Sequence, residues 1–311
     1  MDVLSDVIEV MRTGRPWSAH VRWHAPWAQE FATVPGSAGF QVVLQGRCWL
    51  LDSGAEPLRL GAGDVLFMPR GHGHTLADSP ATPAPVTPCG PDGPLPSEPY
   101  ASDSVDRSGA QGPVTALLCG TYQLDPDRAH PLLHTLPDRI HLPADEGRHR
   151  ELRSAVELLA AELDDRRLGM DAVVPALLDT LLLYILRIWF AEQPARGNTT
   201  GWAAALNDTC VTTALAAIHR DPAAPWTVAA LAAEAGLSRA AFARRFAALV
   251  GRPPLGYLTW WRMTTAARLL RASKAPLRSI AVQVGYASEF AFADAFKRMY
   301  GTPPGGYRRG T

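Results

Sequence analysis

The sequence has 311 residues, enough for two domains of ordinary size, each with its own hydrophobic core. Hydrophobic residues make up 47% and charged residues 19% of it, which excludes a generally disordered chain. The net charge is zero, yet residues 202–311 hold 14 Lys and Arg against 5 Asp and Glu, a charge of +9. This third of the chain is therefore a candidate for nucleic-acid binding, whereas the remainder, with 16 basic and 25 acidic residues, is not.

The N-terminal segment has three acidic residues within its first nine positions and no apolar core of a secretory signal, so we expect a cytoplasmic protein. The most apolar run, residues 172–190, is interrupted by Pro175, Asp179 and Arg187, which favours a buried or dimerising helix over a membrane span. The four cysteines form no CxxC pair, so neither a disulfide framework nor a thiolate zinc site is indicated.

The predicted elements begin with strands. Residues 17–80 alternate short apolar runs with turn residues, as in FQVVLQGRCWLLDSG, which predicts a β-barrel or sandwich. Residues 79–112 are rich in Pro, Ser, Gly and Asp, and we expect them to form a mobile loop. VTALLCGTYQL, residues 114–124, then predicts a strand that returns to the same β unit, which we assign to residues 1–143.

From residue 144 onward the apolar residues follow a helical period. One helix carries an apolar stripe that includes Leu152, Leu159 and Leu163, and residues 171–192 predict a second, more apolar helix. Residues 144–194 thus predict a helical hairpin. Such a hairpin could form a homodimer interface or pack against its own β unit.

The basic region contains an internal repeat. A shift of fifty positions aligns AGLSRAAFARRFAALVGRPPLGYL, residues 235–258, with VGYASEFAFADAFKRMYGTPPGGYR, residues 284–308, and places Ser238 on Ser288. Each copy predicts a helix, a glycine turn and a second helix that starts after the serine, which is the helix-turn-helix plan. Phenylalanines at i and i+4 pack inward and leave the positions between them for solvent or a DNA groove. A plain helical bundle is the alternative.

The second copy, VGYASEFAFADAFKRMYGTPPGGYR, resembles the signature of AraC/XylS-type transcription regulators, and the resemblance covers about residues 205–309. It implies an all-α DNA-binding domain over residues 203–309, with seven helices and two helix-turn-helix motifs joined by a long helix. The resemblance also implies a cytoplasmic protein that binds promoter DNA and contacts RNA polymerase. Its implied function is to regulate transcription, for example as an activator.

The resemblance assigns the exposed positions of the first reading helix. We expect Arg244 to donate two hydrogen bonds to a guanine edge, and Arg239 and Arg245 to contact phosphate. The full set of exposed positions is Arg239, Ala240, Ala243, Arg244 and Arg245.

The matching positions of the second reading helix differ in charge. Asp294 departs from the basic or polar residue common in the family; it would repel phosphate and could accept from cytosine. Phe290 could contact a thymine methyl group or be packed away from solvent. We therefore expect the second helix to read DNA less, or differently, than the first. The full set is Glu289, Phe290, Ala293, Asp294 and Lys297.

GDVLFMPRGHGH, residues 63–74, resembles the second conserved motif of cupins, and the resemblance covers about residues 15–142. It implies a cupin-like sensor barrel ahead of the DNA-binding domain, with His74 at a metal-ligand position. The stretch that corresponds to the first cupin motif has Gln41 and Gln45 instead of histidines, and glutamines are poor ligands for a transition metal.

Three histidines stay open as ligands of zinc or another divalent metal: His24, His72 and His74. For each of them, a hydrogen-bonded structural histidine is the alternative. We predict no certain cofactor.

Three cysteines are candidates for a redox switch. Cys48 and Cys119 lie on predicted strands, and the CGTYQL context is similar to a branch of these regulators that includes sensors of oxidants, with buried inert thiols as the alternative. Cys89 lies in the Pro-rich segment, where we expect it to be exposed and able to meet an oxidant.

The sequence thus predicts an α+β protein: a cupin-like β-barrel with a helical hairpin, then an all-α domain with two helix-turn-helix motifs. We expect a sequence-specific transcription regulator, not an enzyme, that responds to an unknown small molecule or oxidant. The alternative is a cupin metalloenzyme, a dioxygenase or isomerase, fused to a helical tail.

Overall fold

The computed structural model describes residues 2–11, 16–52, 54–84, 88–90, 100–105, 112–123, 130–144, 149–165, 167–197 and 200–309. Internal contacts divide the chain into two compact units. The helical unit combines Met1–Val10 with Phe190–Thr311, and the barrel unit is Met11–Trp189. This division differs from the expected one in two respects, because the helical hairpin belongs with the barrel and the first ten residues belong with the C-terminal helices.

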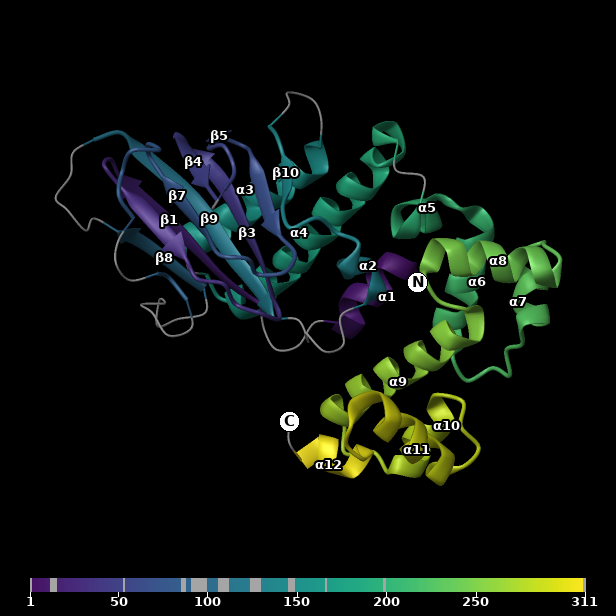
Figure 1. The fold of residues 1–311 in the computed structure, drawn as a ribbon. Coiled ribbons are helices and arrows are strands. Elements are labelled where there is room, and N and C mark those ends of the chain that lie inside the picture. The colour runs from purple at the N-terminus through teal and green to yellow at the C-terminus, as the bar shows by residue number, and fades with distance from the viewer. Residues whose placement is uncertain are drawn as a thin grey trace. The chain divides into compact units, whose positions relative to one another are not determined.

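Among the described residues, the barrel unit has ten strands in two sheets that share one hydrophobic core (Figure 1). The six-stranded sheet has the order β10-β6-β3-β9-β1-β8, and the four-stranded sheet has the order β2-β7-β4-β5. The strands are β1 (Trp17–His24), β2 (Ala28–Phe31), β3 (Ser37–Gln45), β4 (Arg47–Leu51), β5 (Leu58–Gly61), β6 (Val65–Met68), β7 (His74–Ala77), β8 (Tyr100–Val105), β9 (Val114–Gln123) and β10 (Ile140–Leu142).

The alternation of side chains along each strand builds this core. On β1, Ala19, Val21 and Trp23 belong to the core cluster, and Leu117 and Cys119 of the neighbouring strand β9 join them. Side chains of the four-stranded sheet complete the cluster from the opposite side. The predicted β unit, including its returning strand at residues 114–124, is confirmed.

The helical hairpin packs on the barrel. It consists of α3 (Arg150–Asp164) and α4 (Met170–Glu192), and α3 contacts β1 and β8 (Figure 1). The Tyr122 hydroxyl on β9 donates a hydrogen bond to the carbonyl oxygen of Leu178 on α4. The apolar stripe predicted on α3 is buried, as its members Leu152, Val156, Leu159 and Leu163 show.

By length and composition alone, α4 could cross a membrane. Its sequence contains Pro175, Asp179 and Arg187, however, and 44% of its most apolar window is buried inside the protein. Leu181 and Ile185 are fully buried. The apolar character of this helix therefore reflects its packing in the barrel unit.

The Pro-rich segment contains more structure than expected. Residues 100–105 form β8, which pairs in parallel with β1 at the edge of the six-stranded sheet. Cys89 forms an isolated bridge with Phe31 at the end of β2. The expectation of one mobile loop over residues 79–112 was wrong for these parts, because backbone pairing to distant strands supplies order that the local composition does not indicate.

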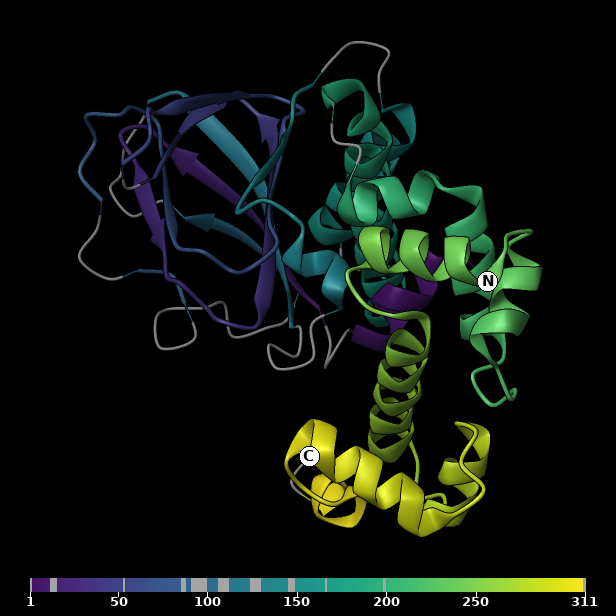
Figure 2. The same ribbon diagram turned by 45° about the vertical axis from the view of Figure 1, so that its right-hand side comes forward.

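The helical unit contains two groups of short helices at the two ends of the long helix α9, as Figure 2 shows. Its elements are α1 (Val3–Met11), a 3-10 turn (Pro194–Arg196), α5 (Gly201–Asn207), α6 (Thr209–Arg220), α7 (Val228–Glu234), α8 (Arg239–Val250), α9 (Pro254–Ala272), α10 (Leu277–Gln283), α11 (Glu289–Tyr300) and α12 (Pro304–Arg309). The seven helices α6 to α12 cover the predicted all-α domain and confirm its two helix-turn-helix motifs. A further short helix, α2 (Pro131–His134), belongs to the barrel unit.

The N-terminal helix α1 is fixed to this unit by polar contacts. Asp6 accepts a hydrogen bond from Nδ1 of His219 on α6 at 3.2 Å, and Glu9 forms an ion pair with Arg268 on α9. Both Asp6 and His219 are buried. The two residues are 213 positions apart in the sequence, so no local pattern predicts this contact.

Candidate functional site

The two helix-turn-helix motifs have the same local construction. Each reading helix starts at a serine whose Oγ accepts from a backbone N–H at 3.4 Å, Ser238 from Ala241 and Ser288 from Ala291. Each helix also buries two tilted phenylalanine rings, with centroids 5.5 Å apart in α8 and 5.7 Å apart in α11. The internal repeat of the sequence therefore corresponds to a repeated structure.

The turns before the reading helices require glycine. Gly236 has a φ of +66° and Gly285 a φ of +82°, values that side chains with a Cβ rarely adopt. A Cβ on Gly285 would also lie 2.9 Å from the carbonyl oxygen of Ala223, whereas a Cβ on Gly236 would meet no atom within 4 Å. The second turn is therefore the more tightly constrained of the two.

On α8, all five predicted exposed positions reach the surface, with Ala243 half-buried and the others exposed. Arg244 and Arg245 also line a groove of about 930 Å³ between α8 and the segment of α5 and α6, beside Asp208. Arg245 donates to the carboxylate of Asp208, which is itself nearly buried. Arg239 and Arg244 thus remain the cations of α8 for which the structure gives no carboxylate partner among the described residues.

On α11, the five predicted positions also face outward. Glu289, Asp294 and Lys297 are exposed, and Ala293 is half-buried. The Phe290 side chain is 86% exposed, so the alternative that it packs inside the chain is wrong. Met299 is 36% exposed, whereas the rings of Tyr300 and Tyr307 pack against Phe296.

The linking helix α9 uses one of its arginines for structure. Arg262 donates from Nε to the carbonyl oxygen of Pro222 at 2.7 Å and from Nη2 to that of Ala224 at 2.9 Å. Its guanidinium also lies over the Tyr286 ring at 5.9 Å. Half-burial lowers its pKa, although the nearby Tyr286 and Asp221 favour the charged form. Arg262 therefore connects the loop after α6 to the second turn.

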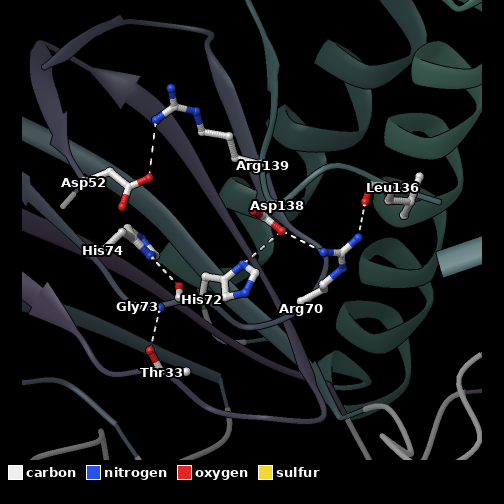
Figure 3. Close-up of polar contacts among 9 residues, drawn as sticks. All are labelled: Thr33, Asp52, Arg70, His72, Gly73, His74, Leu136, Asp138 and Arg139. Atoms are coloured by element: carbon white, nitrogen blue, oxygen red, sulfur yellow. Dashed lines mark hydrogen bonds and ion pairs between the residues drawn. The ribbon is translucent and has the colours of Figure 1, made fainter. Parts of the chain in front are cut away.

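In the barrel unit, the three histidines considered as metal ligands have different surroundings. His72 is half exposed, with Nδ1 3.6 Å from the Asp138 carboxylate, which also accepts from Arg70 (Figure 3). The Nδ1 atom of His74 donates to the carbonyl oxygen of His72 at 3.2 Å, and its ring stacks on Phe31 inside the barrel. His24 donates from Nδ1 to the carbonyl oxygen of Gly112.

This arrangement does not fit a metal centre. Within the described part of the chain, no three His, Cys, Asp or Glu side chains gather where they could hold an ion. Burial lowers the pKa of His74 to about 4, so its imidazole is neutral, and its Nε2 has no hydrogen-bond partner among the described residues. Gln41 is buried with its Oε1 also unpartnered, whereas Gln45 is exposed.

The three candidate redox cysteines lie close to one another in the barrel unit. Burial raises the pKa of the Cys119 thiol well above its usual value, and the neighbouring Cys89 and Cys48 raise it further. Burial and the charge of Asp64 raise the pKa of Cys48 to about 12. Cys89 is half-buried, and its backbone pairs with Glu30 and Ala32. Cys89 was expected to be exposed and mobile; it is half-buried instead, and its backbone is paired with the segment that includes the end of β2.

Two polar clusters were missed from the sequence. The first is the Asp6–His219 pair, which continues through the Tyr257 hydroxyl, a donor to His219 Nε2 at 2.7 Å. The second joins the hairpin to the barrel, where buried His20 on β1 donates to Asp164 on α3. Within each cluster, the interacting residues lie far apart in the sequence. The one local sign of such a contact is a polar residue at a position where the pattern would place an apolar residue.

The chain matches known families over most of its length. Residues 2–191 match the cupin family model, and residues 231–310 match a helix-turn-helix domain. An AraC-like transcription regulator of Streptomyces lividans is 39% identical over 310 residues, 99% of this chain and 98% of that one. Another, from Streptomyces antibioticus, is 37% identical over 311 residues, 99% of each chain. The RCS-specific HTH-type transcriptional activator RclR of Escherichia coli (strain K12) is 33% identical over 196 residues, 62% of this chain and 68% of that one. The chain therefore belongs to the AraC family of transcription regulators, with a cupin domain ahead of two helix-turn-helix motifs.

Proposed function

We propose that this regulator binds promoter DNA with α8 and α11 in the major groove and that Arg244 on α8 reads a guanine. The single observation that carries this proposal is the repeated helix-turn-helix structure in the basic part of the chain, with Arg244 exposed at the centre of its reading helix. An arginine there can donate two hydrogen bonds to guanine O6 and N7, which supplies about 1–3 kcal/mol of discrimination between bases.

Phosphate contacts would add affinity without sequence preference. Residues 202–311 carry a charge of +9, and the exposed Arg239 lies in the first turn of α8. Each phosphate neutralised by a protein cation releases condensed counterions from the DNA. Binding should therefore weaken steeply as salt concentration rises.

A titration of full-length protein against its own upstream DNA tests the proposal. We expect a specific complex whose affinity falls with salt, and about tenfold or more weaker binding by Arg244→Ala. Arg167→Ala, which removes the same charge from the barrel unit, is the matched control and should bind as the wild type does. Absence of any specific complex, or equal binding by Arg244→Ala, would contradict the proposal.

We infer that a small-molecule effector binds inside the barrel and provides the signal. Among the buried polar atoms that have no hydrogen-bond partner within the described part of the chain are Nε2 of His74, Oε1 of Gln41 and Nε1 of Trp27. Because an unpartnered buried polar group is costly, a small molecule that supplies one donor or acceptor to them would bind favourably. Equilibrium dialysis of candidate effectors against wild type and His74→Leu would test this arm.

Oxidation of the barrel cysteines is the second route for a signal, and the Escherichia coli relative is itself named an RCS-specific activator. A disulfide between Cys89 and Cys119 would form with loss of two protons and two electrons to an oxidant such as hypochlorous acid. Cys119 is buried and its pKa is raised, whereas Cys89 is only half-buried, so Cys89 would be the first target. A reporter that responds equally in Cys89→Ser and wild type would exclude this route.

A homodimer through the hairpin is the proposed assembly. Leu158 on α3 and Val173 on α4 are 58% and 41% exposed, and Leu168 between the two helices is also exposed. Light scattering should show a dimer that Leu158→Glu weakens. We infer that the protein is cytoplasmic and contacts RNA polymerase at the promoter; the buried residues of α4 within the barrel unit support the first part of this inference. A cupin metalloenzyme needs several metal-ligand side chains that lie close together. The described residues contain no group of three His, Cys, Asp or Glu side chains that could hold an ion, which supports a regulator over an enzyme.

A further inference from the structure

The side chain of Phe290 is unusual within its helix. It is 86% exposed, whereas Phe292 and Phe296, two and six positions later, are fully buried. Phe290 is the second residue of α11, and the first residues of a reading helix are those that contact base edges in helix-turn-helix proteins. An aromatic ring is thus presented at the place where bases are read.

The first copy of the repeat shows what has changed at this surface. At the aligned positions, Arg239 corresponds to Glu289, Ala240 to Phe290 and Arg244 to Asp294. Two positive charges of α8 are thus replaced by two negative charges in α11, and a methyl group is replaced by a phenyl ring. Because the caps and buried phenylalanines are the same in both motifs, these differences concern the outward face alone.

We propose that α11 reads thymine through the contact of Phe290 with its 5-methyl group, while Asp294 accepts from the exocyclic amine of an adenine or cytosine. The inference rests on the proposed function and adds the chemistry of the second reading head. Phenylalanine is one of the side chains that contact thymine methyl groups in the major groove. A carboxylate rejects guanine, whose groove edge presents O6 and N7, both acceptors.

One kind of base pair satisfies both side chains. An A·T pair presents a methyl group and an amine donor on the same major-groove edge, so Phe290 and Asp294 can be matched within a short A·T segment. The operator is therefore asymmetric: a guanine-containing segment for α8 and an A·T segment for α11. Only recognition of the guanine-containing segment depends strongly on hydrogen bonds from arginine.

The test removes single methyl groups from the DNA. The probe is the shortest fragment of the protein's own upstream region that forms a specific complex, and each thymine in turn is replaced by deoxyuridine, which lacks only the 5-methyl group. At one fixed salt concentration, wild-type protein should bind about fourfold more weakly at one or two of these positions, since one apolar carbon leaves the contact.

The variant Phe290→Ala completes the cycle. We expect it to bind the thymine probe more weakly than wild type does and to make no distinction between thymine and deoxyuridine. Because Phe290 is exposed, its thermal unfolding should match that of wild type. Val282→Ala is the control, since Val282 is an exposed apolar residue of α10, outside the reading helix, and it should keep the thymine preference.

Four results would contradict either the proposed function or the role of Phe290, and they can be told apart. No specific complex with upstream DNA would overturn the proposed function itself. A specific complex that is indifferent to every deoxyuridine would overturn only the role of Phe290, as would an undiminished thymine preference in Phe290→Ala. Reduced transcription by Phe290→Ala with unchanged DNA affinity would instead assign the ring to a protein partner and also overturn the inference.

Discussion

The imidazole of His219 stacks on the indole of Trp261, with ring centroids 3.7 Å apart and ring planes inclined by 5°. Both nitrogens of this imidazole are engaged, Nδ1 as donor to Asp6 and Nε2 as acceptor from Tyr257. A side chain from the start of the chain thus completes a polar cluster between α6 and α9. The helical unit, which contains the two helix-turn-helix motifs, consequently includes residues that precede the barrel in the sequence.

Asp6→Ala should destabilise the helical unit. The substitution leaves the buried Nδ1–H of His219 without a partner, which costs about 1–3 kcal/mol of unfolding free energy. Urea unfolding of the full chain measures the change. Glu9→Ala is the control, because the Glu9–Arg268 pair is exposed enough that its loss should cost less than about 1 kcal/mol. Equal effects of the two substitutions would contradict a structural role for the Asp6–His219 contact.

The stability of the barrel unit should fall at acidic pH. Burial lowers the pKa of His74 to about 4, below the value of 6.5 expected in the unfolded chain. The unfolded chain therefore takes up the proton first, and stability is lost as pH falls from 6.5 toward 4. The loss attributable to this residue is about 2 kcal/mol at pH 5 and about 3 kcal/mol below pH 4.

Urea unfolding at pH 7.5 and pH 5 checks this dependence. His74→Gln, which has no titrating group at this position, should retain only the smaller loss that other groups of the barrel unit cause; protonation of buried His219, whose pKa burial also lowers, acts on the helical unit. A variant that loses as much stability as wild type between the two pH values would show that His74 is not responsible.

The two turn glycines should differ in their tolerance of a side chain. Gly236→Ala should cost about 1–2 kcal/mol from its left-handed backbone alone. Gly285→Ala should cost at least about 1 kcal/mol more, because its Cβ would overlap the Ala223 backbone and the Arg262 guanidinium. Thermal unfolding of both variants provides the comparison. The same melting temperature for both would indicate that the loop containing Ala223 moves away freely.

Asp294→Arg, which introduces the residue that the first copy has at the aligned position, should remove the proposed contact of α11 with an adenine or cytosine amine and increase the dependence of DNA binding on salt. An added cation that neutralises one phosphate makes the slope of log affinity against log salt more negative by about 0.9. Glu162→Arg on α3 makes the same charge change in the barrel unit and serves as the control. A slope that is unchanged in Asp294→Arg would mean that α11 lies outside the reach of phosphates.

Patterns that repeat locally were predictable from the sequence, and contacts between distant segments were not. The serine cap and paired phenylalanines of residues 235–258 recur fifty positions later, and the turn glycine Gly236 has its counterpart in Gly285, so both helix-turn-helix motifs could be recognised. The strand at residues 100–105 could not, because it is ordered by pairing with β1 rather than by its own composition. The position of Cys89 depends in the same way on Phe31.

The candidate site shows the same limit at the level of single side chains. Outward-facing positions of α8 and α11 follow from helical period, and the structure places them at the surface. The helical period cannot show which of the outward-facing charged side chains forms an ion pair within the protein. Only the fold brings Asp208 to Arg245, 37 positions later, and separates the surroundings of His72 from those of His74.

Asp208 has two tasks, since its Oδ1 accepts from the Val211 backbone N–H at the start of α6 and its Oδ2 accepts from Arg245 on the reading helix. Arg245 consequently carries its counterion within the protein. In the proposed DNA complex, a cation that is neutralised in this way would release few ions, so the ion release associated with α8 would come from Arg239 and Arg244. Asp208→Asn would turn Arg245 into a third free cation on α8, at the expense of the anchor that holds the first turn of α6 to the reading helix.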